Sequence, residues 1–152
     1  MDKNCFLIKL SESERTDFGR IDFADHSETQ KVFSAIWDLE SEVNNGGFEQ
    51  YFASTESESI AFTQTALRTV GAARCAAIVE RAISLVFTTF DSATQEARID
   101  YLEAITDDVR EQLDILDSAF FEYPDDLTDL LFEFVASNQE IFGPIPNDID
   151  VE

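Results

Sequence analysis

The sequence predicts an all-α fold, a single compact bundle of about six to seven helices with a short irregular N-terminal arm. Apolar side chains recur every three or four residues from Ser27 onward, which is the period of a helix, and capping residues, glycines and prolines separate these segments. The 152 residues, 44% of them hydrophobic, suffice for one buried core. We expect an arm at residues 1–26, a helical domain at 27–142 and an acidic tail at 143–152. The run Cys5–Leu10 fits either a short strand or an arm that packs on the helices.

The first helix is expected to begin after Ser27 and to end at residues 44–47. Ser27 and Gln30 have the spacing of a capping box, in which each side chain bonds the backbone of the other residue. The Asn-Asn-Gly-Gly sequence at 44–47 favours a helix end, because Asn and Gly tolerate the left-handed backbone found there. Phe48 and Tyr51 then indicate a short second helix with aromatic side chains.

Isolated signals set the remaining helix boundaries. Gly71 divides two helices, Ser92 begins another capping box, and Thr106 caps the helix that follows. Pro124 ends that helix because proline cannot continue it, and Gly143 ends the last one.

Net charge is the most unusual property of the chain. There are 32 Asp and Glu residues against 10 Lys and Arg, a formal net charge of −22. Residues 1–90 hold 14 acidic and 8 basic residues, whereas residues 91–152 hold 18 acidic residues and only two basic ones. Direct binding to nucleic acid or to an anionic membrane is disfavoured, because both require basic patches. A partner with a basic surface, adaptation to high salt and a general gain in solubility each explain the charge.

The acidic residues of the C-terminal part are spaced so that they would share helix faces. One row has members three or four residues apart: Glu96, Asp100, Glu103, Asp107, Glu111, Asp114 and Asp117. Such a row places a charge about every 5 Å, which is sparser than the phosphates of one DNA strand at about 3.4 Å. Imitation of DNA would need a second row, for which the candidates are Asp125, Asp126, Asp129 and Glu133. The alternative is an ordinary solvated helix face.

No combination of residues points to catalysis, to a metal or to a cofactor. His26 is the only histidine, and its place before a helix cap is typical of a surface residue. The sequence has no phosphate-binding or nucleophile-elbow motif. Cys5 and Cys75 lack metal-binding spacing, and with no signal-like segment or apolar run of about 20 residues we expect a soluble cytoplasmic protein with reduced thiols. We therefore predict a protein that is not an enzyme and uses no cofactor or metal ion.

The segment Trp37–Phe52 resembles the signature of the bacterial DNA-mimic-protein domain family. Its characteristic positions here are Trp37, Asn44, Asn45, Gly46, Gly47, Phe48 and Gln50. Weaker similarities at residues 66–72, 116–120 and 123–131 extend the resemblance over residues 28–142. It implies an all-α fold and, from the best-known member, a dimer whose acidic surface occupies the DNA-binding face of a transcription factor. We interpret the signature residues as structural, closing one helix and orienting the next, with a ligand or partner pocket as the alternative.

Together these features favour an acidic DNA-mimic protein that binds the DNA-binding face of a basic regulator or nucleoid protein and blocks its access to DNA. The expected partner is thus a basic DNA-binding protein, and a homodimer is the candidate assembly. One alternative is an immunity or antitoxin-type protein that neutralises a basic toxin. Another is a salt-adapted helical domain with no specific partner.

Overall fold

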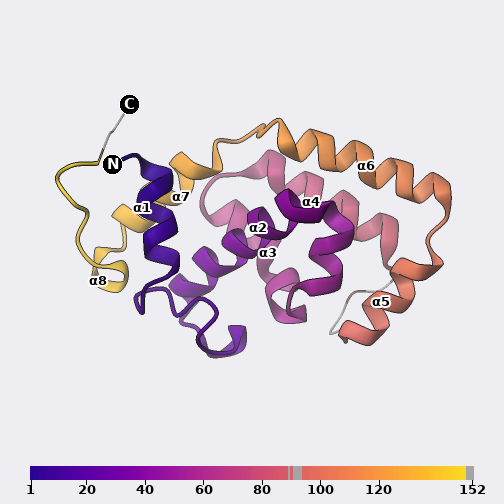
Figure 1. The fold of residues 1–152 in the computed structure, drawn as a ribbon, viewed down its shortest axis with the longest axis horizontal. Coiled ribbons are helices and arrows are strands. Elements are labelled where there is room, and N and C mark those ends of the chain that lie inside the picture. The colour runs from indigo at the N-terminus through magenta and orange to yellow at the C-terminus, as the bar shows by residue number, and fades with distance from the viewer. Residues whose placement is uncertain (89, 91–93, 150–152) are drawn as a thin grey trace.

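The computed structural model describes residues 1–88, 90 and 94–149, and within these ranges it contains helices and no β-strand (Figure 1). The α-helices are α1 (Lys3–Ser11), α2 (Glu28–Ser54), α3 (Ser57–Thr69), α4 (Ala73–Val86), α5 (Gln95–Ala104), α6 (Asp107–Phe121), α7 (Leu127–Ala136) and α8 (Gln139–Phe142), with a 3-10 helix η1 (Phe23–Asp25) before α2. The prediction of an all-α fold is confirmed. None of the described helices is both long and apolar enough to cross a membrane.

Helix α2 forms the centre of the bundle. It packs on α3, α5 and α6, while α4 packs on α3 and α6. Figure 1 shows α1, α7 and α8 at one end of the elongated molecule and α5 at the other, with α6 along the upper edge. The acid-rich helices α5, α6 and α7 therefore follow the periphery of the molecule and do not form one layer.

Helix α2 is broken where the sequence predicts a helix end. Ser27 and Gln30 form the expected capping box at its start. Gly46 (φ −157°, ψ 22°) and Gly47 (φ 74°, ψ −171°) leave the helical conformation, so the axis changes direction there. The helix resumes at Phe48, which confirms the predicted division into two segments.

The second half of α2 supplies the aromatic centre of the core. Phe48 and Phe52 are fully buried. The ring of Phe48 lies 6.2 Å from that of Phe120 on α6, and the ring of Phe52 lies 5.1 Å from that of Phe87 after α4. Burial of a side chain of this size contributes about 1.5–3 kcal/mol to the stability of the fold. Because the break in α2 sets the direction of the segment that carries Phe48 and Phe52, it also sets where α6 and the end of α4 pack.

The N-terminal arm, predicted as irregular, is helical in part, and this helix is one reason why the structure has more helices than predicted. Lys3–Ser11 form α1, which Asp2 caps by accepting a hydrogen bond from the Cys5 amide at 2.7 Å. Phe6 is buried, with its ring 5.8 Å from that of Phe132 on α7. The apolar run of α1 is too short to show a helical period, and only the contact with α7 identifies its inner side.

Other boundaries follow the sequence signals closely. Gly71 (φ 89°) separates α3 from α4, and the side chain of Thr106 caps α6. Helix α5 begins after Thr94, whose hydroxyl accepts a hydrogen bond from the Ala97 amide at 3.2 Å. The predicted cap Ser92 lies outside the described residues.

The C-terminal part of the chain departs from the helical pattern once more. Asn138 (φ −129°, ψ 46°) divides the last predicted helix into α7 and α8, which is the second reason for the larger number of helices. Residues 143–149, predicted as part of a tail, lie beside the start of α1, where the amino group of Met1 donates to the Asp148 carbonyl at 2.9 Å. Residues 150–152 lie outside the described residues.

Replacement of Gly47 by alanine is expected to destabilise the fold more than replacement of Gly71. Both glycines have positive φ, which costs an alanine about 1–2 kcal/mol, and the ψ of −171° at Gly47 raises this cost to about 1–3 kcal/mol. A Cβ at Gly47 would also lie 2.9 Å from Cγ of Asp117, whereas no described residue other than the chain neighbours lies within 4 Å of one at Gly71. Urea denaturation should show a loss of about 2–5 kcal/mol for Gly47→Ala and about 1–2 kcal/mol for Gly71→Ala. Equal losses would contradict a close contact at Gly47.

Candidate protein-binding surface

Helices α5 and α6 present most of the predicted acidic row to solvent. The exposed members, which we call the α5–α6 surface, are Glu96, Asp100, Glu103, Asp107, Glu111 and Asp114. Arg98 is buried, so Arg110 is the one basic residue that these two helices expose. The surface therefore keeps a large excess of negative charge.

The α5–α6 surface is divided into two short rows and is not one helical stripe. Ile105, between the helices, is extended (φ −67°, ψ 146°), and Thr106 begins a new helix. Figure 1 shows α5 turned away from the line of α6. The regular spacing in sequence therefore continues on each helix but not across the turn.

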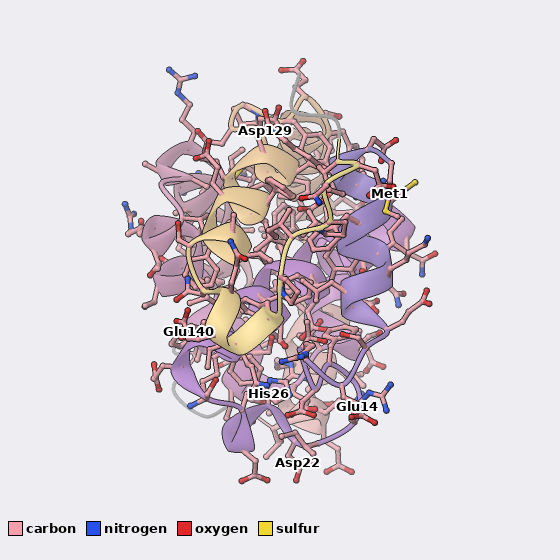
Figure 2. The ribbon with its side chains drawn as sticks, turned by 90° about the vertical axis from the view of Figure 1, so that its left-hand side faces the viewer. Met1, Glu14, Asp22, His26, Asp129 and Glu140 are labelled. Atoms are coloured by element: carbon pink, nitrogen blue, oxygen red, sulfur yellow. The ribbon has the colours of Figure 1, made fainter. Side chains whose placement is uncertain are left out.

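The predicted second row lies elsewhere and largely makes structural contacts. Figure 1 places α7 at the end of the molecule opposite α5, and Figure 2 looks onto that end, with Asp129 in its upper part. Asp129 accepts from Nζ of Lys3 at 2.9 Å, and Asp126 caps α7. Asp125 accepts at 2.8 Å from an amide in the first turn of α4. Glu133 is exposed on the outer side of α7.

Asp117, the last member of the predicted first row, is half-buried and turns toward the break in α2. Its Oδ1 accepts a hydrogen bond from the Phe48 amide at 2.9 Å. Phe48 begins the second half of α2, where a carboxylate satisfies an unpaired amide and interacts favourably with the helix dipole. Burial raises the pKa of Asp117 above its ordinary value. Asp117 thus attaches α6 to the break in α2.

Arg98 attaches α5 to the core through its positively charged guanidinium group, whereas Asp117 uses a carboxylate. Its side chain is 2% exposed, and it is the one buried residue of α5. Nε donates to the Phe52 carbonyl at 2.8 Å, and the other guanidinium nitrogens donate to the Thr55 carbonyl and the Ser57 hydroxyl. These acceptors belong to the end of α2 and the start of α3. These hydrogen bonds therefore position α5, together with the partly buried side chains of Tyr101 and Leu102, which pack against the core.

An open groove of about 470 Å³ borders the α5–α6 surface. It is lined by Gly46, Glu49, Gln50, Ala53, Ile99, Leu102, Glu103 and Arg110. Nε of Arg110 lies 3.3 Å from Oε1 of Glu49, and its Nη1 lies 3.8 Å from Oδ1 of Asp107. The groove thus combines apolar side chains with carboxylates, and Arg110 partly neutralises those carboxylates.

Several signature residues near the α2 break make structural contacts. Trp37 stacks on Phe33 with ring centroids 5.4 Å apart. Asn44 donates to the Tyr123 hydroxyl at 2.9 Å, and that hydroxyl donates to Glu40 at 3.5 Å. Burial raises the pKa of Glu40 to about 7, although the hydrogen bond from Tyr123 opposes the rise.

The other signature positions lie nearer solvent. Asn45 is exposed, while Gly46 and Gln50 line the groove. Gln50 donates from Nε2 to Glu42 and to Ser54, each at 2.9 Å. These positions fit both a role in orienting the helix and a role in the groove wall.

Sequence reasoning missed the residues that hold this surface in place. Arg98 stands out in the sequence only as one of two basic residues in 91–152. Asp117 stands out only as a member of the predicted acidic row and of a weak family similarity, and neither indicates a contact with α2. His26 was also placed wrongly, because it is 7% exposed and not a surface residue. Its Nε2 bonds the Asp17 carbonyl at 3.1 Å, since the loop before η1 folds back over α2.

The fold and this surface define a class of protein: an all-α bundle with acidic peripheral helices and a kinked central helix. The family model of DMP19-like proteins matches residues 24–138. This match covers most of the chain, which therefore belongs to the DMP19-like protein family, named after a DNA mimic protein. Comparisons with curated proteins and with solved structures found no match.

Proposed function

We propose that this protein is an acidic DNA mimic that works in the cytoplasm. Its partner is a basic regulator or nucleoid protein, whose DNA-binding face it covers and keeps from DNA. The observation that carries the proposal is the α5–α6 surface, six exposed carboxylates beside a single exposed arginine, in a chain of the DMP19-like family. Such a surface attracts the lysines and arginines that otherwise contact phosphates.

The groove beside the surface supports the same kind of partner. Lysine and arginine carry apolar stems below their charged ends. The side chains of Ile99 and Leu102 offer those stems an apolar wall, while Glu103 lies at the charged edge. A basic helix laid along α5 and α6 would therefore find both kinds of contact.

A homodimer is the assembly that we propose for binding. One row of carboxylates about 5 Å apart is sparser than the phosphates of DNA. Asp125, Asp126 and Asp129 make contacts within the chain, so α7 contributes few free charges to a second row. A second copy would supply another α5–α6 surface and double the number of carboxylates that a partner meets.

Affinity capture tests the proposed function directly. The full-length protein is immobilised, exposed to an extract of the cells that make it, and washed at about 50 and then about 200 mM salt. We expect mass spectrometry to identify a DNA-binding protein that leaves the column as salt rises and that duplex DNA displaces. Recovery of no DNA-binding protein at low salt would contradict the proposal, and recovery of a basic toxin would favour the immunity function.

Neutralisation of the α5–α6 surface is expected to weaken binding of the captured partner by about fourfold to several hundredfold, because each of the four exposed ion pairs removed contributes about 0.2–1 kcal/mol. The test variant carries Asp100→Asn, Glu103→Gln, Glu111→Gln and Asp114→Asn. The control removes four exposed charges from the other end of the chain: Glu12→Gln, Glu14→Gln, Asp22→Asn and Asp25→Asn. Titration calorimetry should show a much smaller loss for the control. Equal losses would mean that net charge, and not this surface, governs binding.

Removal of Arg110 is expected to strengthen binding by up to about fivefold. Arg110 pairs with Glu49 and Asp107 and so competes with cations of the partner for the groove. The matched control is Arg68→Ala, which removes the same charge from an exposed pair with Glu80 on α4. Calorimetric titration with the captured partner compares the affinities of Arg110→Ala and Arg68→Ala. If Arg110→Ala gains no more affinity than Arg68→Ala, the partner does not contact the groove beside Arg110.

A further inference from the structure

A small polar cavity of about 80 Å³ lies where the loop before η1 folds over the start of α2 and the α2–α3 turn. Its lining includes the polar residues His26, Ser34, Asp38 and Glu56 and the aromatic residues Phe18 and Phe23. In Figure 2, His26 lies low on the face, in the region that also carries Glu14 and Asp22.

Two buried polar groups at the cavity have no hydrogen-bond partner among the described residues: Nδ1 of His26 and Oγ of Ser34. Their residues are 7% and 1% exposed. Nε2 of His26 lies 3.1 Å from the Asp17 carbonyl, which only accepts, so Nε2 carries the ring proton. Nδ1 of the neutral ring is then an acceptor. Leaving such groups unpaired is costly, which points to an occupant of the cavity.

Two carboxylates add negative charge to the same cavity. Oδ2 of Asp38 accepts from the Ser59 hydroxyl at 2.7 Å, and Oε2 of Glu56 accepts from the Phe23 amide at 3.1 Å. Neither carboxylate takes part in the ion pairs found among the described residues. Burial and, to a smaller extent, the charge of Glu56 raise the pKa of Asp38 to about 6. Within the described part of the chain no hydrogen bond reaches the second oxygen of Asp38, which can therefore accept from a donor.

We propose that this cavity binds a primary ammonium group. A primary ammonium has three N–H donors, which match His26 Nδ1, the Ser34 hydroxyl and the second Asp38 oxygen, and its positive charge offsets the two carboxylates. The aromatic residue Phe23, which lines the cavity, already has Nζ of Lys31 at 6.0 Å from its ring centroid, so this part of the molecule accommodates a cation. No group of three side chains suited to a metal ion occurs within the described ranges, so the donor set fits N–H donors better than a metal.

The size of the cavity restricts the ligand further. A volume of about 80 Å³ accommodates a few water molecules or a group as small as methylammonium. The ammonium can belong to a free small amine or to the end of a lysine side chain of another protein. Both share the chemistry that the cavity recognises. The inference does not rest on the proposed DNA mimicry.

Titration of the full-length protein with methylammonium chloride, followed by NMR of the His26 ring, tests the proposal. Because the chain has one histidine, its ring signals need no further assignment. We expect a saturable shift of the Nδ1 signal with methylammonium and none with tetramethylammonium chloride at equal ionic strength, since the latter has charge but no N–H donor. An equal response to both salts, or no saturation, would overturn the proposal and leave water as the occupant.

Variants give the same test an independent readout. Asp38→Asn keeps an acceptor for Ser59 but loses the charge, and it should weaken methylammonium binding at least tenfold, whereas the exposed Asp22→Asn should not change it. Ser34→Ala serves if Asp38→Asn does not fold, with a loss of a few-fold expected. Unchanged binding in these variants would exclude the cavity as the site.

Titration with N-acetyl-lysine methylamide distinguishes the two sources of the ammonium group. Binding comparable to that of methylammonium supports a lysine side chain of another protein, and binding of methylammonium alone supports a free amine.

Discussion

The acidic surface depends on two charged side chains, the buried Arg98 and the half-buried Asp117, that attach its helices to α2. Arg98 bonds the end of α2 and the start of α3, and Asp117 bonds the amide of Phe48. Helices that expose so many like charges repel one another, and α5 buries no apolar residue fully. Hydrogen bonds to charged groups contribute about 1.5–3 kcal/mol each, enough to hold a weakly apolar helix in place. The hydrogen bonds of Arg98 and Asp117 thereby offset the repulsion among the exposed carboxylates of α5 and α6.

The break in α2 connects the family signature with this surface. Gly47 leaves no room for a side chain because the Asp117 carboxylate occupies the space, so α6 approaches α2 closely at that point. Beyond the break, Phe48 packs on Phe120, and the carbonyl of Phe52 receives Arg98. Gly46 and Gln50 also line the groove beside α5. The signature is mainly apolar and turn-forming, yet it positions the helices that carry the acidic residues.

The sequence predicted those features that depend on neighbouring residues. The capping box at Ser27, the break at residues 44–47 and the cap at Thr106 are local hydrogen-bonding patterns, and the structure contains each of them. Helix α1 escaped prediction because its inner side is defined by α7, far along the chain. The acidic row was predicted from spacing alone, and spacing does not show that Asp117 turns inward or that Ile105 separates α5 from α6. Contacts between segments far apart in the sequence determine which side chains of a helix turn inward and where one helix ends.

Hydrogen–deuterium exchange of Arg98→Met tests most directly whether a buried arginine holds α5 in place. Methionine retains the volume and loses the donors to Phe52 and Thr55. The account predicts that amides of α5 exchange at least about tenfold faster while those of α3 and α4 keep their protection, because only the local docking of α5 is lost. Arg68→Met, at an exposed position, should leave the exchange of α5 unchanged. Protection of α5 that persists in Arg98→Met would contradict the account.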